Sequence, residues 1–160
     1  HLEALREAME VFGRGSVTTH LIVGLGETEE KLIRMVQWCV DNGIYPSLFA
    51  FTPIPGSLME DYPRPTLDSY RRAQIAQYLI THSIARYENM KFEMERLVDP
   101  GISDKRLMAI VETGEPFRTS GCPDCNRPYY NERPGGPIYN YPRKPSKNEI
   151  EEIREKIGIL

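Results

Sequence analysis

The sequence lacks any run of about 18 uncharged apolar residues, so no segment has the length and character of a membrane-spanning helix. Neither sign of charge dominates, because 20 basic and 23 acidic side chains leave a net charge of −3. This slightly acidic balance argues against a protein whose main partner is the nucleic-acid backbone. The composition is globular, at 40% hydrophobic and 27% charged, and 160 residues suffice for about one domain. We therefore expect neither a nucleic-acid nor a membrane partner.

Cysteine is also scarce. The three cysteines are an odd number and no secretory signal precedes them, which argues against a disulfide framework and predicts a reducing, cytoplasmic location. Cys39 lies in line with Leu32 and Val36 at helical spacing, so we expect a buried structural thiol there. The chain opens on His1, without an initiator Met and already within a helical pattern. We interpret it as a fragment of a longer protein.

Hydrophobic periodicity divides most of the chain into alternating helices and strands. The expected helices cover residues 2–12, 28–41, 66–95 and 103–113, with a last one from Ser146, and the expected strands cover 17–23 and 45–51. Thr28 followed by two glutamates is a helix N-terminal signal, because carboxylates are stabilised near the positive end of the helix dipole. Strands that alternate with helices of this length indicate parallel β-α units.

Two β-α units cannot close a barrel, and on their own they would expose sheet edges. We therefore predict an α/β fold in which residues 1–113 are the C-terminal part of a partial, TIM-type β/α barrel; an open doubly wound sheet is the alternative. Residues 114–160 are predicted to form an irregular extension. In a barrel, the chemistry lies at the carboxyl ends of the strands. Here those ends are residues 24–27 and 52–56, where glycine and proline concentrate.

The turn Gly24-Leu25-Gly26-Glu27 lacks the third glycine of a dinucleotide fingerprint, because position 29 is Glu29. A phosphate cradle is therefore not expected. The two glycines still permit close approach of a ligand to the backbone, and Glu27 could fix the loop or accept a hydrogen bond from an amine. His20 points the same way as Ile22 and Gly24 in a strand, so the three could line one surface.

The extension is rich in proline and tyrosine and is locally basic, with six Lys or Arg against two acidic residues over 118–147. Its most informative feature is the pair Cys122-x-x-Cys125, in a loop bounded by glycine and proline. Such a pair can place two thiolates on one metal ion or cluster. A redox dithiol is less favoured, because those motifs open a helix after a strand and this loop follows none. Two further ligands are needed, and the histidines lie elsewhere in the chain.

The segment from Thr19 to Thr28 resembles the fifth-strand motif of radical S-adenosylmethionine (SAM) enzymes, G-x-I-x-G-x-x-E. Ile22, Gly24 and Glu27 match this motif, and His20 stands where its first glycine would be. The resemblance implies that Ile22 contacts adenine and that Glu27 supports the turn.

The segment Phe51-Thr52-Pro53-Ile54-Pro55-Gly56-Ser57 is similar to the sixth-strand segment of biotin synthase-like members, which also borders SAM. Together the two resemblances cover about residues 2–95, the second half of such a barrel. They imply a SAM site made by His20, Ile22, Gly24, Glu27, Phe51, Thr52 and Pro53. The catalytic residues stay unknown at this point.

The string from Arg118 to Tyr130 resembles the C-terminal region of two-component lipoyl synthases, which insert sulfur into protein-bound octanoyl chains. This implies an auxiliary 4Fe–4S cluster held partly by Cys122 and Cys125. The Arg-Thr-Ser string is also similar to the Arg-Ser-Ser-Tyr of single-chain lipoyl synthase, which makes Ser120 a further candidate ligand. The implied partners are an acyl-carrier or lipoyl-type protein domain as substrate and a sister radical SAM subunit.

The three-cysteine loop C-x3-C-x2-C, which binds the radical SAM 4Fe–4S cluster in this superfamily, does not occur in the sequence. Its ligands are therefore expected outside this chain, which should not cleave SAM by itself. The sequence predicts part of a radical SAM sulfur-insertion enzyme, lipoyl synthase-like. The alternatives are a biotin synthase-like or other radical SAM enzyme, and a non-catalytic interaction module stabilised by zinc.

Overall fold

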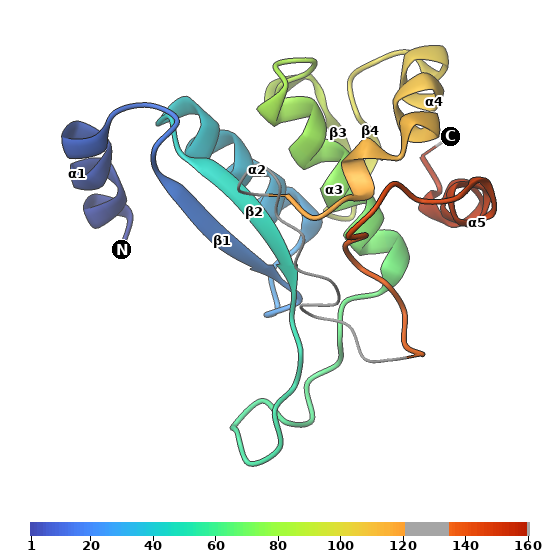
Figure 1. The fold of residues 1–160 in the computed structure, drawn as a ribbon, viewed down its shortest axis with the longest axis horizontal. Helices are drawn as coiled ribbons and strands as arrows, with labels where there is room; N and C mark the ends of the chain where they lie inside the picture. The colour runs from blue at the N-terminus through green and yellow to red at the C-terminus, as the bar shows by residue number, and fades with distance from the viewer. Residues whose placement is uncertain (121–134, 160) are drawn as a thin grey trace.

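A computed structural model of the chain describes residues 1–120 and 135–159. Its first half contains five elements: α1 (Leu2–Phe12), β1 (Thr18–Val23), α2 (Glu29–Asp41), β2 (Tyr45–Ala50) and α3 (Leu67–Thr81) (Figure 1). β1 and β2 pair in parallel, from Thr18 opposite Tyr45 to Val23 opposite Ala50. The predicted β-α-β-α order is therefore confirmed.

Local signals explain where α2 begins and which side of the sheet it covers. Thr28 caps the helix, and its hydroxyl accepts a hydrogen bond from the Lys31 amide at 3.3 Å. Val23 and Leu48 point toward the helices and join a buried core that includes Ile33. Alternate strand residues face the other side, so one face of the sheet carries the core and the other is available for a site.

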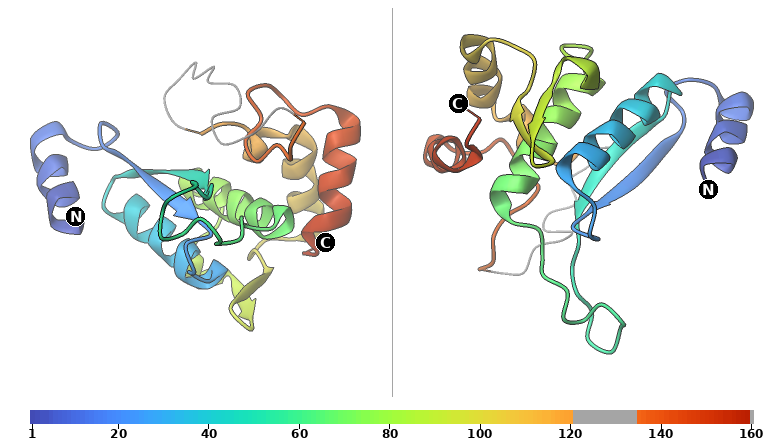
Figure 2. Two further views of the ribbon diagram at one scale, coloured as in Figure 1. Left: turned by 90° about the horizontal axis from the view of Figure 1, so that it is seen from below. Right: turned by 180° about the vertical axis from the view of Figure 1, so that it is seen from behind.

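The second half surrounds α3. It comprises η1 (Tyr87–Asn89), the antiparallel pair β3 (Lys91–Glu93) and β4 (Arg96–Asp99), α4 (Asp104–Thr113), η2 (Glu115–Phe117) and α5 (Lys147–Ile157). From residue 70 to residue 80, every α3 side chain except Tyr78 is buried. α3 contacts α2, β2, η2 and α5. Figure 2 shows α1 at one end of the molecule and α5 at the other, with α3 between them.

The expectation of one helix over residues 66–95 is wrong beyond Thr81. The chain leaves the helix at His82, and Ser83 has a φ of 55°, which a helix cannot contain. Ile84 and Tyr87 nevertheless pack against the core. These two residues are spaced as they would be on the buried face of a longer helix, although the helix itself has ended. The shorter helix expected at 103–113 and the final helix after Ser146 are both confirmed.

Cys39 is buried, with 1% of its surface exposed, in a small cluster with Val17 and Ile44. Burial raises the pKa of its thiol to about 11, so the group stays protonated at neutral pH. The prediction of a structural thiol is confirmed. In the described part of the chain, no helix combines the length and apolar character that crossing a membrane requires.

The described sheet has two parallel strands. Their place in a β/α barrel, and the boundary between residues 113 and 114, stay predictions. Within the described residues, α5 and η2 both contact α3 and contribute to the core that α3 shares with the sheet. The expected barrel part and the helix of the extension are therefore packed together.

The start of α5 gives a test of stability against pH. Ser146 and Glu149 form a capping box, and Arg143 donates two hydrogen bonds to the Glu149 carboxylate at 2.8 and 2.9 Å. The Arg143 hydrogen bonds lower the pKa of Glu149 from 4.5 to about 2. Because the pKa of Glu149 is lower in the folded than in the unfolded chain, its ionised carboxylate stabilises the fold at pH values above 4.5. This stabilisation is lost as the pH falls from 4.5 toward about 2.

We therefore expect Glu149→Gln to lower the free energy of unfolding at pH 7 by about 0.5–2 kcal/mol. The deficit should shrink steadily as the pH falls from 4.5 toward 2. Urea unfolding of both proteins across this range measures it, with Glu151→Gln, an exposed neighbour on α5, as the control. A deficit that did not depend on pH would contradict the role assigned to the ionised carboxylate.

Candidate ligand site at the carboxyl ends of β1 and β2

The turn after β1 is braced by its own glutamate. The Glu27 carboxylate accepts hydrogen bonds from the Gly24 amide at 2.7 Å and from the Leu25 amide at 2.8 Å. Gly24 and Gly26 have φ values of 101° and 100°, which side chains other than glycine rarely adopt. Glu27 therefore fixes the turn, as its position in the sequence motif implied, and the backbone at Gly26 is left open.

The end of β2 lies directly beside this turn. The Phe51 amide donates to the Val23 carbonyl at 2.8 Å, which extends the pairing of the strands by one residue. Thr52 and Pro53 follow, both partly buried, and the Thr52 hydroxyl oxygen is buried without a hydrogen-bond partner among the described residues. The two predicted parts of the site therefore meet at one edge of the sheet.

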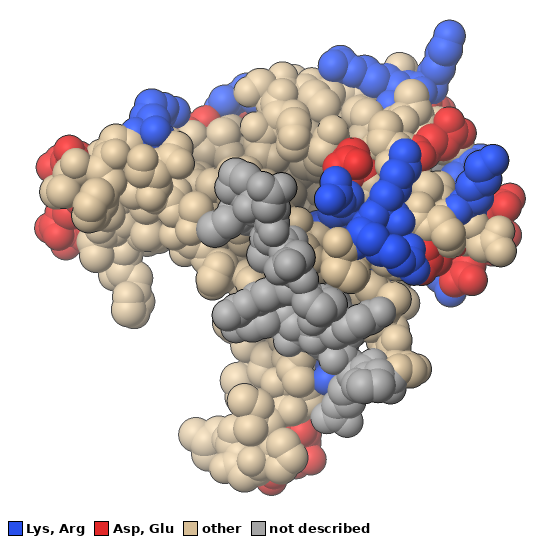
Figure 3. Space-filling view, in the orientation of Figure 1, with Lys and Arg blue, Asp and Glu red and all other residues tan. Residues whose placement is uncertain are grey.

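His20 and Ile22 share the sheet face that turns away from α2. The His20 ring lies 4.5 Å from the ring of Phe49 on β2, and Ile22 is 46% exposed. A cavity of about 490 Å³ runs along β1 and the first turns of α2, lined in part by His20, Ile22 and Leu25. Outside the undescribed segment, this side of the molecule is almost free of charge over β1 and β2 (Figure 3). The surface suits an apolar ring system.

Of the three predicted metal-ligating residues, the structure describes one. Cys122 and Cys125 lie outside the described residues. Ser120 is partly buried just after η2. Among residues 1–120 and 135–159, no group of three or more His, Cys, Asp or Glu side chains could hold a metal ion. The grouping of Cys122, Cys125 and Ser120 on one cluster therefore stays a prediction.

The segments on either side of residues 121–134 are tied to each other. The Thr119 amide donates to the Tyr141 carbonyl, and the Tyr141 amide donates to the Phe117 carbonyl, both at 2.9 Å. The pair forms a short parallel bridge next to α3. The segment that carries Cys122 and Cys125 is therefore held at both ends on the same side of the core.

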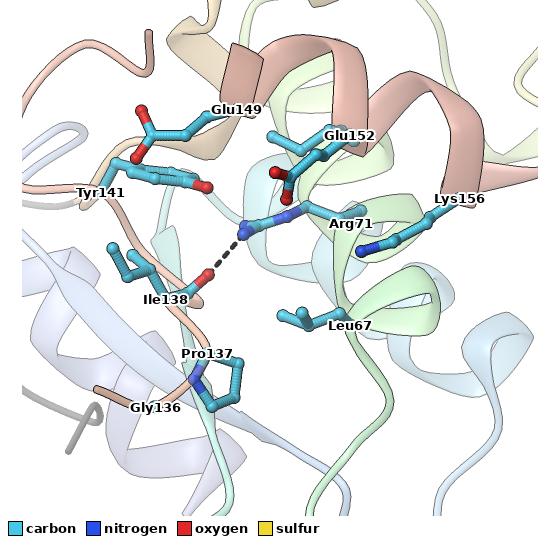
Figure 4. A pocket seen from close by; sticks show the side chains of 10 residues that line it. Leu67, Arg71, Gly136, Pro137, Ile138, Tyr141, Glu149, Glu152 and Lys156 are labelled. Atoms are coloured by element: carbon cyan, nitrogen blue, oxygen red, sulfur yellow. Dashed lines mark hydrogen bonds between the residues drawn. The ribbon is translucent and has the colours of Figure 1, made fainter. Parts of the chain in front are cut away.

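Arg71 on α3 anchors the returning segment (Figure 4). It is buried and donates to the carbonyls of Ile138 and Tyr139, and its guanidinium lies over the ring of Tyr141, 5.2 Å from the centroid. A cavity of about 250 Å³ beside it is bounded by α5 and by residues 136–138. The sequence did not predict this role, because an arginine within a helix is usually expected to face solvent.

Sequence reasoning also missed the chain that returns from the loop after β2. Pro65 packs so closely on the β1 turn that a Cβ at Gly24 would lie 2.9 Å from its Cδ. The Tyr139 hydroxyl donates to the Pro65 carbonyl at 2.8 Å. The prolines at 63 and 65 signal a stiff segment, but nothing local signals that it folds back onto Gly24.

The fold defines an α/β protein with a candidate ligand site at the carboxyl ends of adjacent parallel strands. The chain is 31% identical over 67 residues to bacteriochlorophyllide c C-7(1)-hydroxylase of Chlorobaculum limnaeum. The aligned segment is 42% of this chain and 17% of that enzyme, so the chain spans less than a fifth of the curated relative that it matches. No family model and no solved structure matches the chain.

The matched hydroxylase is a radical SAM enzyme, so this partial similarity is consistent with the radical SAM superfamily. It does not extend to lipoyl synthase-like activity or to sulfur transfer.

Proposed function

We propose that this chain is the C-terminal part of a radical SAM enzyme, in which β1 and β2 belong to a β/α barrel and their carboxyl ends bind SAM. One observation carries the proposal: the turn braced by Glu27 stands directly beside the end of β2. The similarity to a radical SAM hydroxylase supports it independently.

The described residues fit SAM better than they fit a metal. Nothing lies within 4 Å of the Cβ position at Gly26, so a ligand can approach the backbone there. Ile22 and Leu25 offer exposed apolar surface, and the Thr52 hydroxyl oxygen is a buried polar group without a partner in the described chain. Bound SAM supplies such enzymes with a radical that removes hydrogen from an unactivated carbon.

Each residue then has a definite task. Ile22 offers apolar contact to a purine ring, and Glu27 holds the turn so that the amides near Gly26 reach the ligand. Phe51 and Pro53 shield the end of β2 from water, and the Phe51 ring is itself fixed by an edge contact with Tyr62, with centroids 6.4 Å apart. His20 lies on the same face as Ile22 and completes the wall.

We further propose that the reaction is lipoyl synthase-like sulfur insertion, with Cys122, Cys125 and Ser120 as ligands of an auxiliary 4Fe–4S cluster. The hydrogen bond from the Tyr139 hydroxyl to Pro65, which packs on Gly24, supports this, because a cluster that donates sulfur has to sit close to the strand ends. Soft thiolates suit iron–sulfur ligation.

The proposed substrate is an octanoyl chain on an acyl-carrier or lipoyl-type domain, with a sister radical SAM subunit as a second partner. Figure 3 shows Lys and Arg side chains interspersed with Asp and Glu on the side that carries α5. The segment that leads into α5 and its first residue expose Arg143, Lys144 and Lys147. Such a surface suits an acidic protein domain, and its binding should weaken with added salt.

Glu27→Gln tests the site. The variant replaces one acceptor oxygen with an amide nitrogen, so one turn amide loses its partner and the turn loosens. We expect the affinity of the full-length protein for SAM to fall about tenfold or more, since a hydrogen bond to a charged group contributes about 1.5–3 kcal/mol. Equilibrium dialysis against labelled SAM measures it. Glu112→Gln, at an exposed position on α4, is the matched control and should bind SAM normally.

Equal SAM affinity in the Glu27→Gln variant and the wild type would remove Glu27 from the site. Absence of any SAM binding by the full-length wild-type protein would overturn the radical SAM proposal as a whole.

A further inference from the structure

The loop between β2 and α3 returns to the core at Arg64, which stands between Pro63 and Pro65. Both prolines restrict the backbone on either side of it. Pro65 is locked against Gly24 and accepts a hydrogen bond from the Tyr139 hydroxyl at 2.8 Å. The backbone at Arg64 is therefore held in place from both sides, which fixes where its side chain begins.

One nitrogen of the partly buried Arg64 guanidinium is unsatisfied. Arg64 Nη2 is buried and has no hydrogen-bond partner in the part of the chain that the structure describes. A buried donor without a partner is destabilising, and a charged one more so. A buried unsatisfied donor calls for an explanation, and an acceptor supplied by a bound ligand is one.

The two carboxylates that line the same cavity as Arg64, those of Glu27 and Glu29, are already engaged. Glu27 accepts from the amides of Gly24 and Leu25. Glu29 is paired with Arg72, with 2.6 Å between Oε1 and Nη2, and also accepts from the Leu97 amide at 3.0 Å. Arg72 balances the charge of Glu29, so neither acid is available to Arg64.

Arg64 lines a cavity of about 310 Å³. The wall also includes Gly26, Thr66 and Ser69, together with Glu27 and Glu29, whose carboxylates are engaged as described above. Val23 and Leu32 form its floor and belong to the core on the helix side of the sheet. Leu32 also lines the cavity that holds His20 and Ile22, so the two cavities adjoin beside the β1 turn. The volume of the cavity that Arg64 lines is at the lower end of ligand sites and suits one end of a ligand.

We propose that Arg64 binds an oxyanion, a carboxylate or a phosphate group, in this cavity. The planar guanidinium matches both groups, and charge-assisted bonds to it are strong. The ligand would reach the carboxyl end of β1 through the cavity that Arg64, Thr66 and Ser69 line. This assignment goes beyond the proposed function, because it requires neither SAM nor a cluster.

The test titrates sodium phosphate and, separately, sodium acetate into the full-length protein at constant ionic strength, with heat or thermal shift as the readout. Arg64→Gln is compared with Arg106→Gln, at an exposed position on α4. We expect saturable binding that is weakened about tenfold or more in Arg64→Gln and unchanged in Arg106→Gln. Saturation by phosphate alone assigns a phosphate ligand, and saturation by acetate alone assigns a carboxylate. Saturation by neither, or equal binding by Arg64→Gln, overturns the proposal.

A second variant separates ligand binding from a structural role. Arg64→Met removes the unsatisfied donor and keeps an apolar side chain of similar length. Without an oxyanion, its melting temperature should equal or exceed that of the wild type, because Nη2 has no hydrogen bond to the described chain that the substitution could break. Phosphate or acetate should then stabilise the wild type and not the variant. A melting temperature several degrees below that of the wild type would show that Arg64 serves the fold instead.

Discussion

Replacing Arg72 by methionine is expected to lower the free energy of unfolding by about 3–5 kcal/mol, the cost typical of breaking a buried ion pair. The Arg72 side chain is 3% exposed and that of Glu29 is 11% exposed. Arg72 also donates to Asp68 at 3.2 Å and to the Ile157 carbonyl at 3.0 Å. One guanidinium therefore joins α3 to α2 and to the end of α5, and methionine would leave Glu29 buried without its cation.

Two comparisons make this prediction specific. The double variant Arg72→Met with Glu29→Met should recover part of the lost stability, because it no longer buries a lone carboxylate. Arg86→Met, which breaks the exposed pair with Asp41, should have a much smaller effect, since solvent screens that pair. Guanidinium-induced unfolding measures all three. A loss in Arg72→Met no larger than that in Arg86→Met would contradict the structural role of the buried pair.

Local chemistry explains the elements that the sequence predicts well. The start of α2 at Thr28 and the start of α5 at Ser146 both follow from a hydroxyl that accepts a backbone hydrogen bond within the first turn. The strand ends were also predictable, because parallel strands finish at the same edge of a sheet. That rule places Glu27 and Phe51 together from two segments that are far apart in sequence.

The features that the sequence hides depend on contacts between distant residues. The end of α3 was missed because Ile84 and Tyr87 are buried by tertiary packing and imitate helical spacing. The polar residues buried on α3 were missed because their partners come from the far end of the chain. Arg71 meets the carbonyl of Tyr139, which follows it by 68 residues. No local pattern encodes a pairing at that separation.

The same reason applies to Arg64. Its neighbours Pro63 and Pro65 indicate a stiff segment. The cavity forms only when that segment packs on Gly24, where the Tyr139 hydroxyl donates to the Pro65 carbonyl. The strand motif therefore predicts the part of the candidate site around Glu27 and Phe51. The part around Arg64 can be recognised only from the folded structure.

Replacing Cys122 by serine is expected to abolish sulfur insertion by the full-length, anaerobically reconstituted protein while SAM cleavage persists. The proposed auxiliary cluster loses a thiolate ligand, whereas the cluster that cleaves SAM would be held by cysteines outside this chain. Iron content should fall by about four atoms per chain, together with part of the absorbance typical of iron–sulfur clusters. Cys125→Ser should behave in the same way, because both thiolates are assigned to one cluster.

Cys39→Ala is the matched control, because its thiol is buried in an apolar cluster and stays protonated at neutral pH. It should keep the iron content and both activities of the wild type. Joint loss of sulfur insertion and SAM cleavage in Cys122→Ser would point to a folding role for the pair. A colourless wild-type protein that retains zinc would make Cys122 and Cys125 a structural zinc site. Sulfur insertion would then be excluded, while the SAM site at the strand ends would still be decided separately by the Glu27→Gln measurement.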